Sequence, residues 1–246
     1  EYTVYSRAID KAGNETQATN NGITVRTEKV PSGSLYIEGE LSTTELTNEN
    51  VTLTMKLAEG IKEEVYHIEY QAVMGEGEVE EEGPWVKNSE YVATGNRTVY
   101  ARIADEEGQT AAGDYKVFKI ENIDNLPPLA FTPIVTGVSQ TSITVNANGE
   151  NGGEVEDAPE TESSISSGIA SYQYCIVDKN GKVTKMEAVE EYSYTFEQLE
   201  IGSAYSIYVI AKDKAGNERV SEIISSATNV KVGEYADTNT TITGQL

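Results

Sequence analysis

The sequence has very few of the residues on which most enzymes and metal centres depend. Its 246 residues include one cysteine, Cys175, and one histidine, His67. A single cysteine excludes a disulfide within the chain, and Cys175 lies in an apolar-rich strand pattern where a buried, inert thiol is usual. No phosphate-binding glycine loop, Gly-x-Ser-x-Gly or histidine cluster is present, and carboxylates this abundant do not single out a glycosidase pair. We therefore expect no enzymatic activity and no cofactor, with calcium as the one candidate ligand.

Basic residues and long apolar runs are also scarce. The chain has 18 Lys and Arg against 41 Asp and Glu, which gives a net charge of −23. Such a surface repels nucleic acid and anionic membranes, so neither is an expected partner, although it could attract cations or basic proteins. No apolar run is long enough to span a membrane, so we expect no membrane insertion in this segment. The same charge could also serve solubility alone.

One pattern occurs three times in the sequence. It occupies Tyr2–Asn14, Arg97–Gln109 and Tyr205–Asn217, and in each copy apolar and polar residues alternate before Asp-x-x-Gly. Alternation of this period predicts a half-buried strand that enters a hairpin. In the turn, Asp can accept amide hydrogen bonds, and Gly can adopt the positive φ that a β-carbon disfavours. Copies roughly a hundred residues apart indicate tandem sandwich domains.

The repeats divide the chain into four segments. Residues 1–29 are predicted to be the C-terminal hairpin of a truncated sandwich domain, because the chain opens inside a strand. Residues 30–124 and 125–229 each have enough strands for a complete sandwich, and residues 230–246 fit a linker or the start of a next module. The consecutive prolines 127 and 128 stiffen the joint between the two complete domains.

Short alternating segments predict the strands of both domains. In the first domain they lie at 35–38, 51–57, 65–73, 91–92, 99–104 and 115–120. In the second they lie at 142–146, 169–178, 182–189, 192–196, 205–211 and 222–226. Residues 148–168 lie between the first two predicted strands of the second domain. They have six acids, no bases and many Gly and Ser, which favours a mobile loop.

The chain resembles the tandem immunoglobulin-like and fibronectin type III-like repeats of Gram-positive cell-surface proteins. Leu199-Glu-Ile-Gly-Ser-Ala-Tyr205 is similar to the Leu-x-Pro-Gly-x-x-Tyr of fibronectin type III domains. The resemblance implies that Leu199 and Tyr205 form a corner packed on the core. Ile201 departs from the pattern because proline is usual there.

Residues 30–124 resemble the related bacterial immunoglobulin-like repeat. The resemblance is carried by Asn-Val-Thr-Leu-Thr at 50–54, Gly-Ile at 60–61, Gly-x-Trp at 83–85 and Asn-Ile-Asp at 122–124. Arg97 stands where the corner tyrosine would be. For the whole chain the resemblance implies an all-β fold of tandem immunoglobulin-like/fibronectin type III-like β-sandwiches in an extended arrangement. It also implies an extracellular location, either on the bacterial cell surface or secreted.

The function expected from this resemblance is that of a non-catalytic stalk or spacer segment of a multidomain bacterial surface protein. Such a segment presents distal modules for adhesion, and its partners are the neighbouring domains of the same polypeptide. We expect a monomer. The alternatives are a module that binds host or cell-wall glycan or protein directly, and a spacer of a secreted carbohydrate-active enzyme.

Three further features of the sequence are candidates for binding. The joint at 121–127 loosely resembles calcium-binding cadherin linkers, which makes Glu121, Asp124 and Asn125 candidate calcium ligands, with a plain linker as the alternative. One carboxylate in each Asp-x-x-Gly turn is too few for a metal site. Trp85 could stack on a sugar or could cap a small core. The acidic runs at 76–82 and 150–162 could meet a basic partner or be solvated loops.

Overall fold

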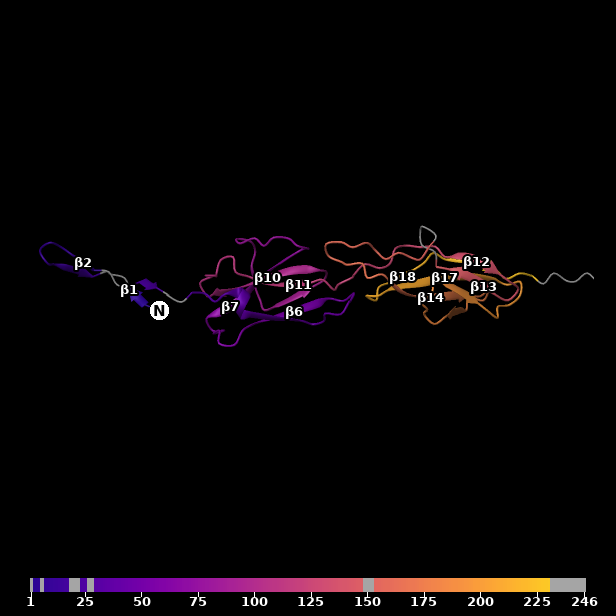
Figure 1. The fold of residues 1–246 in the computed structure, drawn as a ribbon, viewed down its shortest axis with the longest axis horizontal. Coiled ribbons are helices and arrows are strands. Elements are labelled where there is room, and N and C mark those ends of the chain that lie inside the picture. Colours follow the sequence, from indigo (N-terminus) through magenta and orange to yellow (C-terminus); the bar gives the residue numbers. More distant parts are fainter. Residues whose placement is uncertain (1, 5–6, 18–22, 26–28, 148–152, 231–246) are drawn as a thin grey trace, which may run out of the picture. The chain divides into compact units, whose positions relative to one another are not determined.

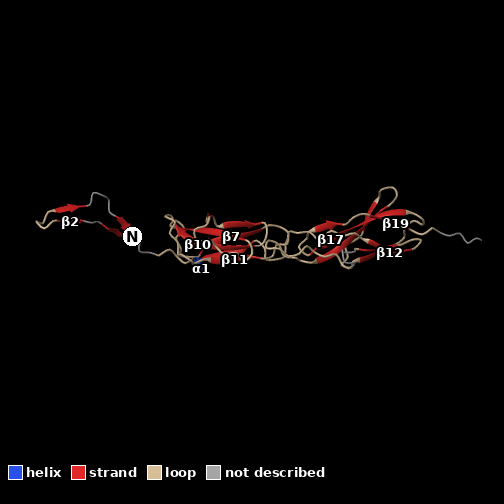
Figure 2. Cartoon of the chain, turned by 90° about the horizontal axis from the view of Figure 1, so that it is seen from above, coloured by secondary structure: helices blue, strands red, loops and turns tan. Residues whose placement is uncertain are grey.

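Strands make up almost all the regular structure of the protein (Figures 1 and 2). The computed structural model describes residues 2–4, 7–17, 23–25, 29–147 and 153–230. It divides into two compact units, unit 1 with residues 1–45 and 50–122, and unit 2 with residues 46–49 and 123–246. The segment 46–49 belongs to unit 2, where Thr47 forms a parallel bridge with Ile123.

The N-terminal residues form two short strand pairs. β2 (Arg7–Ile9) pairs with β3 (Glu15–Gln17) across the predicted turn, and β1 (Tyr2–Val4) pairs with β4 (Ile23–Val25). Both pairs are antiparallel. The strand that returns from the predicted turn is therefore β3, and β4 pairs with β1 instead.

Beyond the N-terminal strand pairs, unit 1 has two antiparallel sheets. The three-stranded sheet has the order β5-β6-β9, and the four-stranded sheet has the order β11-β10-β7-β8. Their strands are β5 (Ile37–Leu41), β6 (Val51–Leu57), β7 (Tyr66–Val73), β8 (Val86–Lys87), β9 (Glu90–Ala93), β10 (Arg97–Asp105) and β11 (Lys116–Ile120).

The core of unit 1 lies between these sheets and follows from the alternation of the sequence. Val51, Leu53 and Met55 of β6 are at most 2 % exposed, whereas the polar residues between them face outward. β10 does the same with Val99 and Ile103, which are at most 1 % exposed. Because successive side chains of a strand point to opposite faces, each central strand supplies one apolar row to the core.

The start of unit 1 corrects the prediction of a strand at 35–38. Residues Gly33–Tyr36 form a single helical turn, α1, in which the carbonyl of Ser32 accepts the amides of Leu35 and Tyr36. The strand β5 begins only at Ile37, which is 1 % exposed. The local hydrogen bonds to Ser32 therefore delay the strand by two residues.

Unit 2 has the same plan. Its three-stranded sheet is β12-β13-β16, and its other sheet is β15-β14-β17-β18, with β19 also paired to β17. Its strands are β12 (Ile134–Val138), β13 (Ile143–Asn146), β14 (Ile169–Val177), β15 (Val183–Lys185), β16 (Ser193–Phe196), β17 (Ala204–Asp213), β18 (Glu218–Val220) and β19 (Ile224–Ala227). Tyr172, Tyr174 and Phe196 are its largest fully buried side chains.

The acidic insertion is packed where the structure describes it, which corrects the prediction of a mobile loop. Val155 is 4 % exposed and belongs to the core of unit 2, and its amide donates to the hydroxyl of Tyr172 at 3.3 Å. Ser164 is fully buried. The burial of the apolar residues Val155 and Ala158 outweighs the acidic composition of the segment. Residues 148–152 lie outside the described part.

Both units are β-sandwiches of the immunoglobulin-like/fibronectin type III-like kind. In each, the first, second and fifth strands form one sheet, and the fourth, third, sixth and last strands form the other. The fourth strands, β8 and β15, pair with the third strands β7 and β14. In constant-type immunoglobulin domains that strand lies on the opposite sheet. The protein is therefore all-β and built from tandem sandwiches.

Candidate functional site

The repeated Asp residues hold turns, as the sequence predicts. Asp213 Oδ1 accepts the backbone amides of Gly216 at 2.7 Å and of Asn217 at 2.8 Å. Asp10 and Asp105 each accept the amides two and four residues further on, at 2.8–2.9 Å. Gly216 has a φ of +106°, which a side chain would strain.

A fourth turn of the same kind joins β14 to β15. Asp178 Oδ1 accepts the amides of Asn180 at 2.8 Å and Lys182 at 2.9 Å, and Gly181 has a φ of +80°. The dipeptide Asn180-Gly181 predicts a hairpin here, and the structure adds the carboxylate that holds it. In four hairpin turns of the described residues, an aspartate carboxylate therefore accepts two backbone amides of the turn.

Asp213 differs from the other turn residues because two more aspartates lie beside it. The carboxylate oxygens of Asp124, Asp157 and Asp213 lie within 4.8 Å of one another, and we call this group the aspartate cluster. Asp124 and Asp213 are each 1 % exposed, and Asp157 is partly buried. Three segments meet here: the start of unit 2, the acidic insertion and the end of β17.

Hydroxyl and amide groups hold the first of these carboxylates in place. Asp124 Oδ1 accepts the hydroxyl of Ser164 at 3.3 Å and the amide of Leu126 at 3.2 Å, and Oδ2 accepts the amide of Ser167 at 3.0 Å. The backbone amide of Asp124 donates to the carbonyl of Thr47 at 2.9 Å. The insertion and the start of unit 2 are therefore joined through this side chain.

The other two carboxylates are held in the same way. Asp157 Oδ2 accepts the amide of Gly168 at 2.7 Å and the hydroxyl of Ser166 at 3.3 Å. The side-chain amide of Asn217 donates both to Asp213 Oδ2 and to the carbonyl oxygen of Asp124, each at 2.8 Å. Asn217 therefore fixes the turn after β17 to the start of unit 2.

Burial changes the acidity of the cluster. The pKa of Asp213 is raised because burial penalises its charge and the Asp124 charge repels it, although the hydrogen bonds from Asn217 and Gly216 act the other way. Asp10 has the same turn in an exposed position, and its pKa is lowered, mainly by the Asn14 hydrogen bonds. A group of close, buried carboxylates can retain a proton, and its oxygens are also the ligand type that hard cations prefer.

The structure places the three predicted calcium ligands in different surroundings. Asp124 lies in the aspartate cluster. Asn125 is exposed, and its backbone amide donates to Ser164 Oγ at 3.1 Å. Glu121 belongs to unit 1, is exposed, and has Lys119 Nζ 3.6 Å from its carboxylate. Calcium binding by these three residues stays a prediction.

Asp157 and Asp213 were not expected to accompany Asp124. The only signal in the sequence is that Asp157 lies in the acidic insertion and Asp213 in a repeated turn, and neither fact gives their separation in space. The path of the insertion brings them together, because Gly168 and Ser167 hydrogen-bond two of the carboxylates.

The corner implied by the family resemblance is present. The hydroxyl of Tyr205 accepts the amide of Glu200 at 2.9 Å, and its ring is 9 % exposed. Leu199 packs against the core of unit 2. These are the features of a tyrosine corner, in which the hydroxyl bonds to backbone a few residues upstream.

Trp85 packs in a cluster of side chains in unit 1. The guanidinium carbon of Arg102 lies 3.9 Å from the indole centroid, and the Tyr115 ring stacks on it with centroids 5.5 Å apart. Arg102 Nη2 also donates to Glu69 Oε2 at 2.8 Å. Arg102 and Glu69 are each less than 20 % exposed, so the cation and the indole are partly removed from water.

The acidic run at 76–82 is fastened by its backbone to the same part of unit 1. The Gln71 side chain accepts the amide of Glu80 at 2.8 Å and donates to its carbonyl at 3.3 Å. The Tyr100 hydroxyl donates to the carbonyl of Gly77 at 3.3 Å, and Trp85 Nε1 donates to that of Glu81 at 3.0 Å. The backbone of the run is therefore ordered, whereas its acidic side chains reach water.

The lone cysteine and the lone histidine each lie in a central strand of a larger sheet. Cys175 is fully buried in β14, and burial raises the pKa of its thiol, as expected of an inert cysteine. His67 lies in β7, with Nε2 3.4 Å from a carboxylate oxygen of Glu69. In the described part of the chain, no helix has the length and apolar character needed to cross a membrane.

Comparisons with known proteins give structural likenesses of low sequence identity. No protein-family model matches the chain, and no curated protein does. The chain is similar to a fibronectin type III domain of human fibronectin type III domain containing protein 3, with 21 % identity over 45 % of this chain and 94 % of the other (TM-score 0.33). It is also similar to the FN1–FN3 domains of chicken CNTN1, with 18 % identity over 91 % and 75 % of the two chains (TM-score 0.37). A segment of consecutive titin domains has 17 % identity over 92 % and 82 % (TM-score 0.46). The fold assignment rests on the strand order of the two units.

Proposed function

We propose that the chain is a non-catalytic stalk or spacer segment of a multidomain bacterial protein that acts outside the cell. In this role its partners are the neighbouring domains of the same polypeptide, and it holds distal modules away from the surface for adhesion. The observation that carries the proposal is the repetition of one sandwich plan in two units, each with its own buried core. Modules that fold around separate cores can be joined in series without an active site.

The roles of the conspicuous residues agree with a spacer. The repeated aspartates form turns, Tyr205 forms a corner, and Trp85 packs against Arg102 and Tyr115. Cys175 is buried. The residues that resemble candidates for catalysis or binding therefore stabilise the two sandwiches. A spacer segment requires this stability and no active site.

Small-angle X-ray scattering of the 246-residue chain tests the proposal. A spacer is expected to give an elongated monomer, with a maximum dimension well above that of one compact globule of the same mass. A compact particle would contradict the spacer role.

A further inference from the structure

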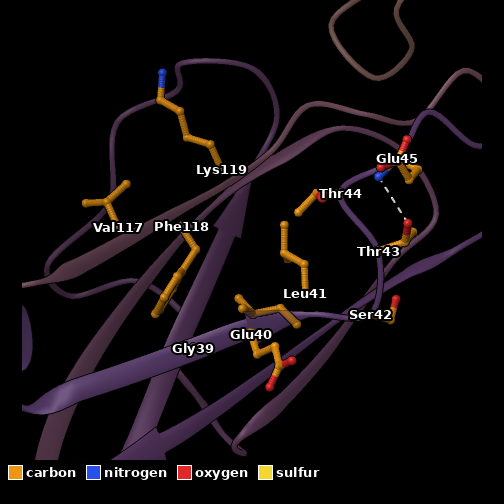
Figure 3. Close-up of a pocket in the computed structure, with 11 residues that line it drawn as sticks. Gly39, Glu40, Leu41, Ser42, Thr43, Thr44, Glu45, Val117, Phe118 and Lys119 are labelled. Carbon is orange, nitrogen blue, oxygen red and sulfur yellow. Dashed lines mark hydrogen bonds between the residues drawn. The ribbon is translucent and has the colours of Figure 1, made fainter.

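Unit 1 has a groove of about 710 Å³ between the edge strands of its two sheets (Figure 3). β5 is the edge of the three-stranded sheet, and β11 is the edge of the four-stranded sheet. The apolar residues that line it are Leu41, Leu53, Val117 and Phe118. The ring of Phe118 occupies the space beside Gly39, where a β-carbon would come within 2.5 Å of a ring atom.

The hydrogen bonds at both ends of β5 identify its unused backbone groups. The amide of Ala58 donates to Tyr36 and the amide of Ser42 donates to Thr52, both at 2.8 Å. Hydrogen-bonded and non-hydrogen-bonded pairs alternate along an antiparallel ladder, so the even-numbered residues of β5 are the ones bonded to β6. The backbone groups directed to the free edge therefore belong to the odd-numbered residues. Among these, the amide of Ile37 already donates to the carbonyl of Gly33 and Ile37 is 1 % exposed, so Gly39 and Leu41 carry the unused groups.

The corresponding seam of unit 2 is closed. There the carbonyl of Phe131 accepts the amide of Glu222 at 3.2 Å, and the carbonyl of Ser139 accepts the amide of Asn229 at 2.8 Å. These bonds tie both ends of the first strand region to the last strands. In the described part of unit 1, no backbone hydrogen bond joins β5 to β11. The groove of unit 1 therefore lies where unit 2 has backbone hydrogen bonds between the regions of its first and last strands.

Charge limits what can occupy the open edge. Glu38 and Glu40 alternate with the inward-facing residues of β5 and are exposed. Glu38 has Lys56 at 3.0 Å, whereas Glu40 has no ion-pair partner among the described residues. Lys119 at the groove is already shared between two carboxylates, and in Figure 3 its ammonium points away from Phe118. The edge is therefore acidic outside and apolar inside.

A second copy of the chain does not fit this edge. The sequence of β5, Ile-Glu-Gly-Glu-Leu, is nearly symmetric about Gly39. Two-fold antiparallel pairing through Gly39 would place Glu38 directly opposite Glu40 of the other copy, and like charges in that position are destabilising. The net charge of −23 on each chain adds to the repulsion.

We propose that the free edge of β5 binds an extended polypeptide in which basic and apolar residues alternate. The bound segment becomes an additional strand of the three-stranded sheet and uses the edge amides and carbonyls of Gly39 and Leu41. Its apolar side chains enter the groove beside Phe118, and its basic side chains lie beside Glu38 and Glu40. Main-chain bonds supply affinity and the alternate side chains supply specificity, as in other cases of strand addition.

The probe for this site is the peptide acetyl-Lys-Val-Lys-Val-Lys-Val-Lys-amide, titrated into the 246-residue chain and followed by amide hydrogen exchange and calorimetry. Binding should slow exchange at Gly39 and Leu41. Glu38 and Glu40 should change little, because their amides already bond to β6. A matched peptide with Glu in place of every Lys should not bind. Binding of the basic peptide without this alternating protection would overturn the proposal.

Two charge-reversal variants separate strand addition from general attraction to an acidic protein. Glu40→Lys should weaken binding of the basic peptide by about fivefold or more, because it removes one favourable cross-strand pair of up to about 1 kcal/mol and adds a repulsive one. Glu90→Lys makes the same charge change on β9, the other edge of the same sheet, and should leave binding nearly unchanged. Equal weakening by both variants would show non-specific attraction. Self-association of the chain that protects the β5 edge amides would show that a second copy occupies the site, and would also overturn the proposal.

Discussion

The sequence Asp-Lys-Ala-Gly-Asn occurs twice, at 10–14 and at 213–217, and the two copies fold alike. In both, the aspartate accepts the amide and the side-chain amide of the asparagine, at 2.8–2.9 Å. The first copy is exposed and its aspartate has a lowered pKa, whereas Asp213 is 1 % exposed and has a raised pKa. Local sequence therefore determines the turn, and the surroundings determine its electrostatics.

The largest expected effect on stability comes from β17, the strand that leads into the second copy of Asp-Lys-Ala-Gly-Asn. Tyr205→Ala should destabilise unit 2 by about 3–5 kcal/mol, because it empties a buried ring site. Tyr205→Phe should cost only about 1 kcal/mol, the hydrogen bond from Glu200. Urea unfolding of the chain, followed by a probe in unit 2, measures both. A negligible effect of the alanine variant would contradict the corner role.

Removing the turn carboxylate tests the two copies directly. Asp213→Ala should destabilise unit 2 by about 2–4 kcal/mol, because it leaves the amides of Gly216 and Asn217 without their acceptor in a buried place. Asp10→Ala, the matched control, should leave the unfolding of unit 2 unchanged. Equal responses of unit 2 to the two variants would show that burial does not distinguish the copies.

Calcium gives a smaller expected effect. If the predicted ligands Glu121, Asp124 and Asn125 bind it with the weak affinity of extracellular modules, 10 mM calcium should stabilise the chain by about 1.4–2.7 kcal/mol, and chelation should reverse this. Glu121→Gln should then reduce the shift in melting temperature. A shift that survives this variant and is lost in Asp157→Asn would place the ion in the aspartate cluster. No change on chelation would contradict calcium binding altogether.

The smallest expected effect is the difference in pKa between Asp10 and Asp213. Carboxyl ¹³C titration by NMR should give Asp10 a pKa below 3.8 and Asp213 a pKa above it. Because the folded pKa of Asp213 lies above the unfolded value, its contribution favours folding below about pH 3.8 and is lost as the pH rises through the folded pKa. Asp10 has the opposite sign. Coincident titration curves would contradict the comparison.

Much of the fold can be predicted from the sequence because it depends on short-range patterns. Alternation gives β6, β10 and β17, and the Asp-x-x-Gly spacing gives the turns, since both act within one strand or hairpin. The helical turn α1 was missed because hydrogen bonds to Ser32 override an apolar pattern that also suits a strand.

The aspartate cluster and the groove could not be predicted in this way. Asp124 and Asp213 meet because the insertion folds over the end of unit 2, and its composition alone suggested a mobile loop. The groove depends on backbone bonds that join the regions of the first and last strands in unit 2 and that are absent from the described residues of unit 1, a difference between residues far apart in the chain. Long-range pairing of this kind leaves no periodic trace in the sequence.

The hydrogen bond from the Asn217 side chain to the carbonyl of Asp124 affects how unit 2 would respond to a pulling force. A pull on the chain at Asp124 does not reach β12 alone, because the Asn217 side chain connects that point to the end of β17, a central strand of the larger sheet. We expect the load to divide between the chain itself and this lateral link before β12 separates from its sheet. Asn217→Ala would remove the link while leaving the backbone bonds of the turn, and it should lower the unfolding force of unit 2.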